Sequence, residues 1–107
     1  VCRLLSGIKL HTKQWTLDDA QACFEKEAYV SGPAARREAE RGAYDPTYGG
    51  YFLGKRGFLK LRRDYEQKLG AAFNLRQFHE RVMTNGIAPI WAHRQLMLPG
   101  DKGEVIE

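Results

Sequence analysis

Signals that start and stop α-helices recur along this chain, and the alternation of apolar and polar residues that marks a β-strand is nearly absent. Thr16 followed by Asp19 has the pattern of a capping box and predicts a helix from there to about Tyr29. Asn74 predicts a second capped start, and Asn85 with Gly86 its end. We therefore predict an all-α fold, a compact bundle of five to six helices.

The remaining helices follow from apolar spacing, prolines and glycines. They are residues 1–10, residues 33–41 with a stop at Gly42, the longest helix over Tyr48–Leu69, and residues 89–98. Residues 43–50 are predicted to form a loop, and residues 99–107 a polar, frayed tail. We expect residues 1–98 to form one helical region.

Composition places the chain among ordinary globular proteins. It has 107 residues, of which 43% are hydrophobic and 28% charged, which argues against disorder and against a disulfide scaffold. The apolar runs are too short for a membrane span or a secretory signal, and the residues leave the compartment open. The first residue is Val1, inside an apolar helical pattern, so we expect a C-terminal fragment of a larger helical protein.

The residues that carry catalytic and metal chemistry are scattered. Cys2 and Cys23 form neither a Cys-x-x-Cys pair nor a zinc ribbon, so we expect two reduced, partly buried thiols. His11, His79 and His93 lie far apart, without a zinc-binding helical pair. We therefore expect this chain to bind no catalytic metal or cofactor and to be inactive alone.

Positive charge is concentrated in one stretch of the sequence. Residues 55–94 carry 9 basic and 3 acidic side chains, within a chain of net charge +4. Such a stretch suits a small basic helical module that binds nucleic acid or a protein partner, using Arg56, Lys60 and Arg63. It equally suits a solvated face. The absence of a short helix-turn-helix pair argues against nucleic acid.

The longest helix carries an apolar stripe, which predicts its buried face. At 100° per residue the stripe comprises Tyr51, Phe58, Leu61, Tyr65 and Leu69. Lys55 and Arg62 fall inside the same arc, so we expect both to be partly buried, either paired with Glu38 or Glu40 or in contact with a substrate or anion. The width of the stripe also predicts exposed apolar surface and self-association of the isolated chain.

A cluster of tyrosines precedes and opens this helix. Tyr44, Tyr48 and Tyr51 surround Gly49 and Gly50, which allow close approach of the backbone. Phenol hydroxyls are neutral at pH 7 and donate hydrogen bonds to carbonyl oxygens or developing oxyanions. The cluster is consistent either with packing or with such a role.

The order and spacing of several motifs resemble the C-terminal end of the bacterial domain of unknown function 885 family. The matching segments are Gly7–His11 with Trp15, Ala35–Arg41, Asp45–Tyr48, Tyr51–Lys55, Leu59–Arg62 and Phe78–Glu80. The resemblance implies a large, mostly helical parent similar to gluzincin zinc metallopeptidases, with its zinc motif upstream of this region. It also implies that the partners of this chain are the rest of the parent polypeptide and a peptide-like substrate.

The resemblance also suggests roles for individual residues. The family's Glu-x-acid-Arg-Tyr run is matched by Glu38, Glu40 and Arg41, but its tyrosine is replaced by Gly42. By analogy with related helical peptidases, Tyr48 and Tyr51 are candidate catalytic residues that stabilise an oxyanion. Arg41 and Lys55 are the candidate substrate-binding residues.

Overall fold

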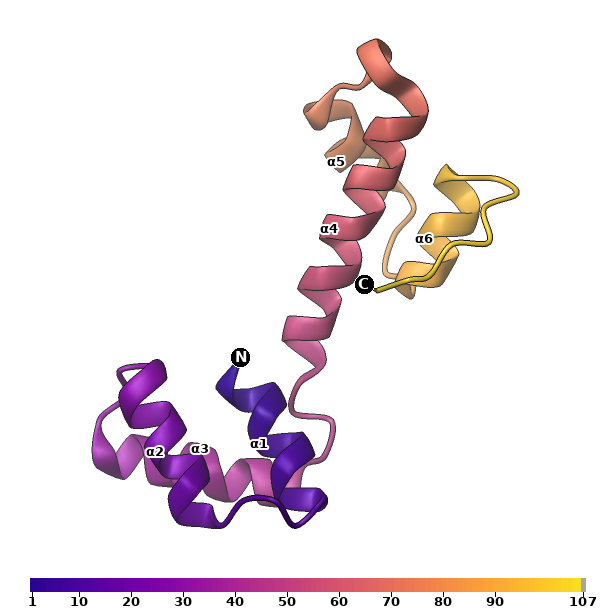
Figure 1. Ribbon diagram of the computed structural model, residues 1–107. Helices are drawn as coiled ribbons and strands as arrows, with labels where there is room; N and C mark the ends of the chain where they lie inside the picture. Colours follow the sequence, from indigo (N-terminus) through magenta and orange to yellow (C-terminus); the bar gives the residue numbers. More distant parts are fainter. Residues whose placement is uncertain (107) are drawn as a thin grey trace. The chain divides into compact units, whose positions relative to one another are not determined.

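The computed structural model describes residues 1–106, and over that range it contains six α-helices, one short 3-10 helix and no strand. The predicted all-α fold is confirmed. The chain divides into two compact units, residues 1–52 and residues 53 onward, which are described separately (Figure 1). The prediction that residues 1–98 behave as one helical region stays a prediction.

The first unit consists of α1 (Cys2–His11), α2 (Leu17–Glu27) and α3 (Gly32–Tyr44), and each helix contacts the other two. The predicted capping box is confirmed: Thr16 Oγ1 accepts a hydrogen bond from the Asp19 backbone N–H, and Asp19 accepts one from the Thr16 backbone N–H. Small buried side chains let the helices approach closely. The buried residues include Ser6, Ala20, Phe24, Ala35 and Ala39.

Two glycines of this unit are explained by close packing. The prediction that Gly42 ends the helix is wrong, because α3 continues to Tyr44. A Cβ atom at Gly42 would lie 3.1 Å from the Ser6 Cβ, so this glycine makes room for α1. At Gly49 a Cβ atom would lie 2.4 Å from Leu4 Cδ1, which confirms the expected close approach there. At Gly50 the same expectation is wrong, because a Cβ atom would meet nothing within 4 Å.

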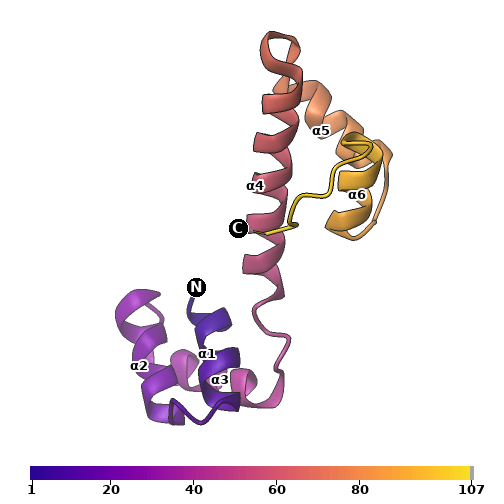
Figure 2. The same cartoon turned by 45° about the vertical axis from the view of Figure 1, so that its right-hand side comes forward.

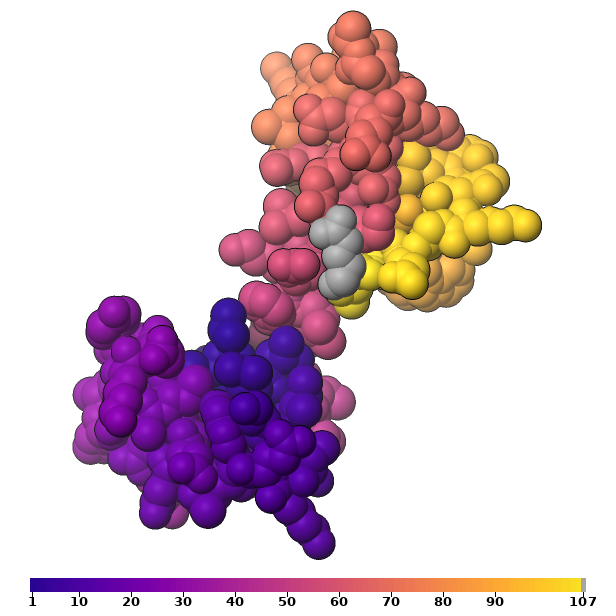
Figure 3. Space-filling view, in the orientation of Figure 1, coloured from indigo at the N-terminus to yellow at the C-terminus, as the bar shows by residue number. Residues whose placement is uncertain are grey.

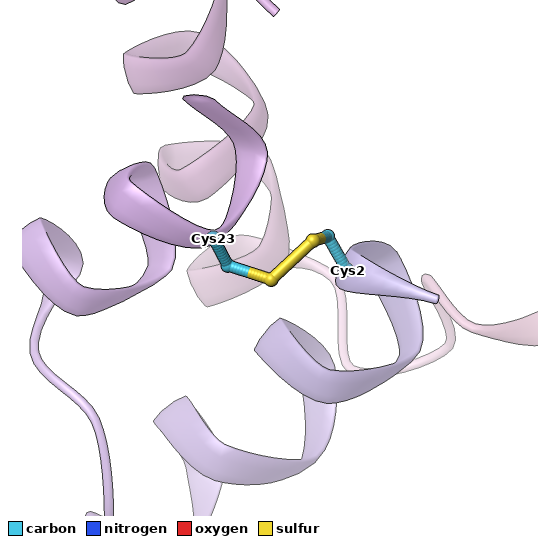
Figure 4. Close-up of a disulfide and its surroundings, with 2 residues drawn as sticks. All are labelled: Cys2 and Cys23. Atoms are coloured by element: carbon cyan, nitrogen blue, oxygen red, sulfur yellow. A yellow bond between two sulfur atoms is a disulfide. The ribbon is translucent and has the colours of Figure 1, made fainter. Parts of the chain in front are cut away.

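The two cysteines are joined in a disulfide, so the expectation of reduced thiols is wrong (Figure 4). Packing of α1 against α2 brings the Cα atoms of Cys2 and Cys23 to 6.0 Å, within the range that a disulfide spans. The two cysteines are 21 positions apart in the sequence, and no local pattern indicates that they meet. The disulfide ties the start of α1 to the middle of α2.

The second unit contains most of α4 (Gly50–Leu69), followed by a 3-10 turn (Gly70–Ala72), α5 (Leu75–Thr84) and α6 (Ile90–Met97) (Figure 2). The predicted end of the longest helix before Gly70 is confirmed. So is the cap at Asn74, whose side-chain oxygen accepts a 3.0 Å hydrogen bond from the Gln77 backbone N–H. The core is formed by large side chains, namely Leu61, Tyr65, Phe78, Met97 and Leu98.

The buried face of α4 differs from the predicted one. Tyr51 is 86% exposed and Phe58 is 37% exposed, whereas Gly57, Leu61 and Tyr65 are buried. Leu61 and Tyr65 of the predicted stripe are thus buried as expected, and the centre of the buried face is shifted from that of the stripe by about 50° towards Gly57, at about 100° per residue. The prediction differs from the structure because the stripe included the exposed rings of Tyr51 and Phe58 and left out Gly57, which has no apolar side chain.

The predicted partial burial is confirmed for Arg62 and is wrong for Lys55, and the predicted ion pairs of both are wrong. Lys55 is exposed, Arg62 is half-buried, and neither forms an ion pair among residues 1–106. Their proposed partners are engaged elsewhere: Glu38 pairs with Arg3. Glu40 pairs with Arg36. Lys60 of α4 is also half-buried, and it is paired with Asp64 one turn along the same helix.

Several large apolar side chains stand on the surface. They include Tyr29, Tyr44, Met83, Ile87, Trp91 and Leu96. The self-association expected from exposed apolar surface stays a prediction. Within residues 1–106, no helix is both long enough and apolar enough to cross a membrane.

Candidate functional site

The first candidate site surrounds Tyr48 in the loop between α3 and α4. The Tyr48 hydroxyl donates a hydrogen bond to Glu38 Oε2. Arg3 donates to both oxygens of the same carboxylate, at 3.0 and 3.2 Å. The guanidinium groups of Arg3 and Arg41 lie over the Tyr48 ring, 5.1 and 5.2 Å from its centroid. The fold thus brings Tyr48 and Arg41 together, as two members of the predicted site.

The electrostatics of this cluster hold Tyr48 as a neutral donor. Burial, followed by the hydrogen bond to the negative Glu38, raises the pKa of the Tyr48 hydroxyl to about 12. The hydrogen bond from Tyr48, followed by those from Arg3, lowers the pKa of Glu38. Glu38 is therefore a carboxylate at pH 7, and the Tyr48 hydroxyl is committed to it.

Tyr51 has a different environment from Tyr48. Its side chain is 86% exposed and makes no hydrogen bond within the part of the chain that the structure describes. Lys55 is exposed as well. Of the four predicted site residues, Tyr48 and Arg41 are therefore in contact with each other, and Tyr51 and Lys55 have side chains available to another molecule.

A second cluster, which the sequence did not reveal, lies in the second unit around Arg94. The Arg94 side chain is 4% exposed; its Nη1 donates to Asp64 at 2.6 Å. Its Nε and Nη2 donate to Asp101 Oδ2 at 3.0 and 2.5 Å. Lys60 donates to Asp64 at 3.0 Å. Asp101 belongs to the segment expected to be frayed, and this contact ties that segment to α6.

These charged side chains line a cleft of about 470 Å³. Figure 3 shows the C-terminal segment, in yellow, beside α4. Hydrogen bonds from Arg94 and Lys60 lower the pKa of Asp64, against the opposing effect of its burial. The hydrogen bonds from Arg94 lower the pKa of Asp101. The only sequence signal for this cluster is the four-residue spacing of Lys60 and Asp64 on one helix face.

The described residues do not offer a zinc centre. Among residues 1–106, no three His, Cys, Asp or Glu side chains lie close enough together to hold a metal ion. The zinc implied by the resemblance has no ligand set in this part of the chain.

The basic binding module is the less favoured function. Lys60, one of its three central cations, lies in the Arg94 cluster with a side chain only 16% exposed, hydrogen-bonded to Asp64. It is not displayed to a polyanion.

Comparison with known proteins gives the family. The model of the family "Bacterial protein of unknown function (DUF885)" matches residues 1–97. The chain belongs to this family. No curated protein and no solved structure matches the chain. The DUF885 match covers α1 to α6 and both clusters, apart from Asp101.

Proposed function

We propose that this chain is the C-terminal helical part of a zinc-dependent peptidase, in which it forms a wall of the substrate pocket and donates a hydrogen bond to the oxyanion. The metal centre lies elsewhere in the parent protein. The proposal is carried by the contrast between Tyr48, in the loop before α4, and Tyr51, in the first turn of α4: the Tyr48 hydroxyl is bound to Glu38, whereas the Tyr51 side chain is exposed.

In this proposal Tyr48 positions the loop and Tyr51 meets the substrate. The bond from Tyr48 to Glu38 fastens the loop to α3, and Gly49 lies against Leu4 of α1. Both contacts lie within the first unit, immediately before Tyr51. A donor on a fixed backbone pays little reorganisation energy when negative charge develops on a peptide carbonyl oxygen. Tyr51 is therefore the candidate catalytic residue and Tyr48 a positioning residue.

Arg41 and Lys55 are the proposed substrate contacts. Arg41 is exposed although its guanidinium lies over the Tyr48 ring, so its outward N–H donors can bind a carboxylate of a peptide. Lys55 follows Tyr51 by one helical turn on α4, and its exposed ammonium group offers a second positive charge.

The test uses the full-length parent protein. Tyr51→Phe should lower kcat for peptide hydrolysis by about 10²-fold with little change in KM, as for the loss of one oxyanion donor. Tyr44→Phe is the matched control, since Tyr44 is 90% exposed and should leave kcat unchanged. Equal kcat in Tyr51→Phe and the wild-type peptidase would remove the catalytic role of Tyr51. A parent without peptidase activity would refute the proposed function.

A further inference from the structure

The cleft beside Arg94 has features of an anion-binding site that its present contacts do not fully use. An arginine is almost never fully buried unless it is paired, and Arg94 is the most buried charged side chain in residues 1–106. Arg94 lies in the wall of a cleft, and the edge of its guanidinium that carries Nε and Nη2 is bonded there to Asp101, which lines the same cleft. A cleft of about 470 Å³ has the size of a small-molecule site.

The contact between Arg94 and Asp101 engages only one carboxylate oxygen of Asp101. Arg94 Nε and Nη2 both donate to the same atom, Asp101 Oδ2. The other oxygen, Oδ1, accepts from the Gly103 backbone N–H at 3.1 Å. A free carboxylate can instead place one oxygen on each N–H group, which is the stronger, two-bond arrangement. Asp101 therefore fills the position of a carboxylate ligand without matching its geometry.

The charges of the cleft favour exchange of Asp101 for an external anion. Three cations line it, Lys60, Lys68 and Arg94, against Asp64 and Asp101. When Asp101 leaves, one acidic side chain remains for three basic ones. Lys68 is exposed and forms no ion pair within residues 1–106, so it is available to the incoming anion.

The segment that carries Asp101 can move without unfolding a helix. Asp101 lies beyond the end of α6 at Met97, between Gly100 and Gly103. The hydrogen bonds of Asp101 are those to Arg94, one backbone bond to Leu98 and its own turn to Gly103. We propose that the Arg94 cleft binds the carboxylate of a small ligand in exchange for Asp101, with Lys68 as a second contact. This site is independent of the role proposed for Tyr51.

The test is a titration of the 107-residue chain with succinate, and separately with inorganic phosphate, followed by calorimetry and by backbone amide NMR. A tethered carboxylate competes at an effective concentration of millimolar order, so Asp101→Ala should bind succinate about tenfold more tightly than the wild type. The shifted amides should be those of the cleft. Asp45→Ala is the matched control, because Asp45 forms the same two-residue turn, to Thr47, outside the cleft. It should bind as the wild type does.

A second variant guards against loss of structure in Asp101→Ala. Lys68→Gln changes an exposed side chain, and it should weaken succinate binding about threefold in the wild-type background, as the loss of one exposed charge contact. The proposal is overturned if Asp101→Ala is folded and binds succinate no more tightly than the wild type, or if Lys68→Gln has no effect. Tighter binding of phosphate than of succinate would overturn the carboxylate assignment.

Discussion

The two units, residues 1–52 and residues 53–106, have similar lengths, yet different interactions stabilise the interior of each. The core of the first unit is built on Cys2, Phe24, Ala35 and Tyr48, with a disulfide between α1 and α2. The second unit has no cysteine. Its core consists of larger side chains, with edge and tilted contacts among Tyr65, Phe73 and Phe78.

The comparison shows two solutions to one problem. A segment of about 50 residues buries too little apolar surface for a secure core of its own. The first unit, whose buried residues include Ser6, Ala20, Ala35 and Ala39, adds a covalent cross-link. The second adds aromatic packing and the ion pairs of Arg94. Each solution predicts a different sensitivity, and amide hydrogen exchange can read the helices of the two units separately.

The largest effect is expected from the core of the second unit. Leu61 is fully buried, and Leu61→Ala should lower the free energy of unfolding of this unit by about 3–4 kcal/mol through lost transfer energy and a cavity. Amide exchange in α5 should accelerate, while α1 to α3 exchange at the wild-type rate. Leu59→Ala is the control, since Leu59 is 38% exposed and should cost less than about 1 kcal/mol. Equal acceleration in both units would show that they unfold together.

Removal of the disulfide should have the reverse effect on amide exchange, destabilising the first unit and not the second. Opening a loop closed over a sequence separation of 21 should lower the free energy of unfolding by about 3 kcal/mol. The double variant Cys2→Ser with Cys23→Ser should therefore accelerate amide exchange in α1 to α3 and leave α5 unchanged. Reduction of the wild type with a thiol should reproduce the result. If exchange in α1 to α3 stays at the wild-type rate, small-residue packing alone holds the first unit.

The parts of the fold that the sequence predicted are those set by neighbouring residues. The capping box of Thr16 and Asp19 spans three residues, as does the cap from Asn74 to Gln77. The contacts that it missed join distant residues. Arg3 meets Glu38 across 35 positions, and Asp64 meets Arg94 across 30. A local pattern carries no information on such pairs, because packing between helices brings them together.

The candidate site was predicted in part for the same reason. The tyrosine cluster is local, so Tyr48 and Tyr51 could be named. Their different environments come from the burial of Tyr48 and its bond to Glu38 on α3, which no local pattern indicates. The predicted buried face of α4 left out Gly57, where a Cβ atom would lie 2.6 Å from Ile90 Cδ1. A glycine adds nothing to an apolar stripe, although here it makes room for Ile90, the first residue of α6.

The smallest effect tests the polar cluster of the first unit. Tyr48→Phe removes the hydroxyl bound to Glu38 and keeps the ring. A hydrogen bond to a charged group contributes about 1.5–3 kcal/mol, and since Glu38 keeps Arg3 we expect a loss near the lower end, about 1.5–2 kcal/mol at pH 7. The measurement is urea unfolding followed by Trp15 fluorescence in a Trp91→Phe background, so that only the first unit is reported.

Lowering the pH should reduce the difference in unfolding free energy between Tyr48→Phe and the wild type. The folded protein lowers the pKa of Glu38 below its ordinary 4.5, chiefly through Tyr48, so the stabilisation is complete above that value. It is lost as the pH falls through the lowered pKa, when the carboxyl is protonated in both states. In Tyr48→Phe the main cause of the lowering is gone, so the difference in stability between the two proteins should shrink as the pH falls through the lowered pKa of Glu38. Tyr44→Phe, which changes a 90% exposed tyrosine, should match the wild type at every pH. A difference that stays constant until the wild-type protein unfolds in acid would mean that the hydroxyl acts through packing and not through the charge of Glu38.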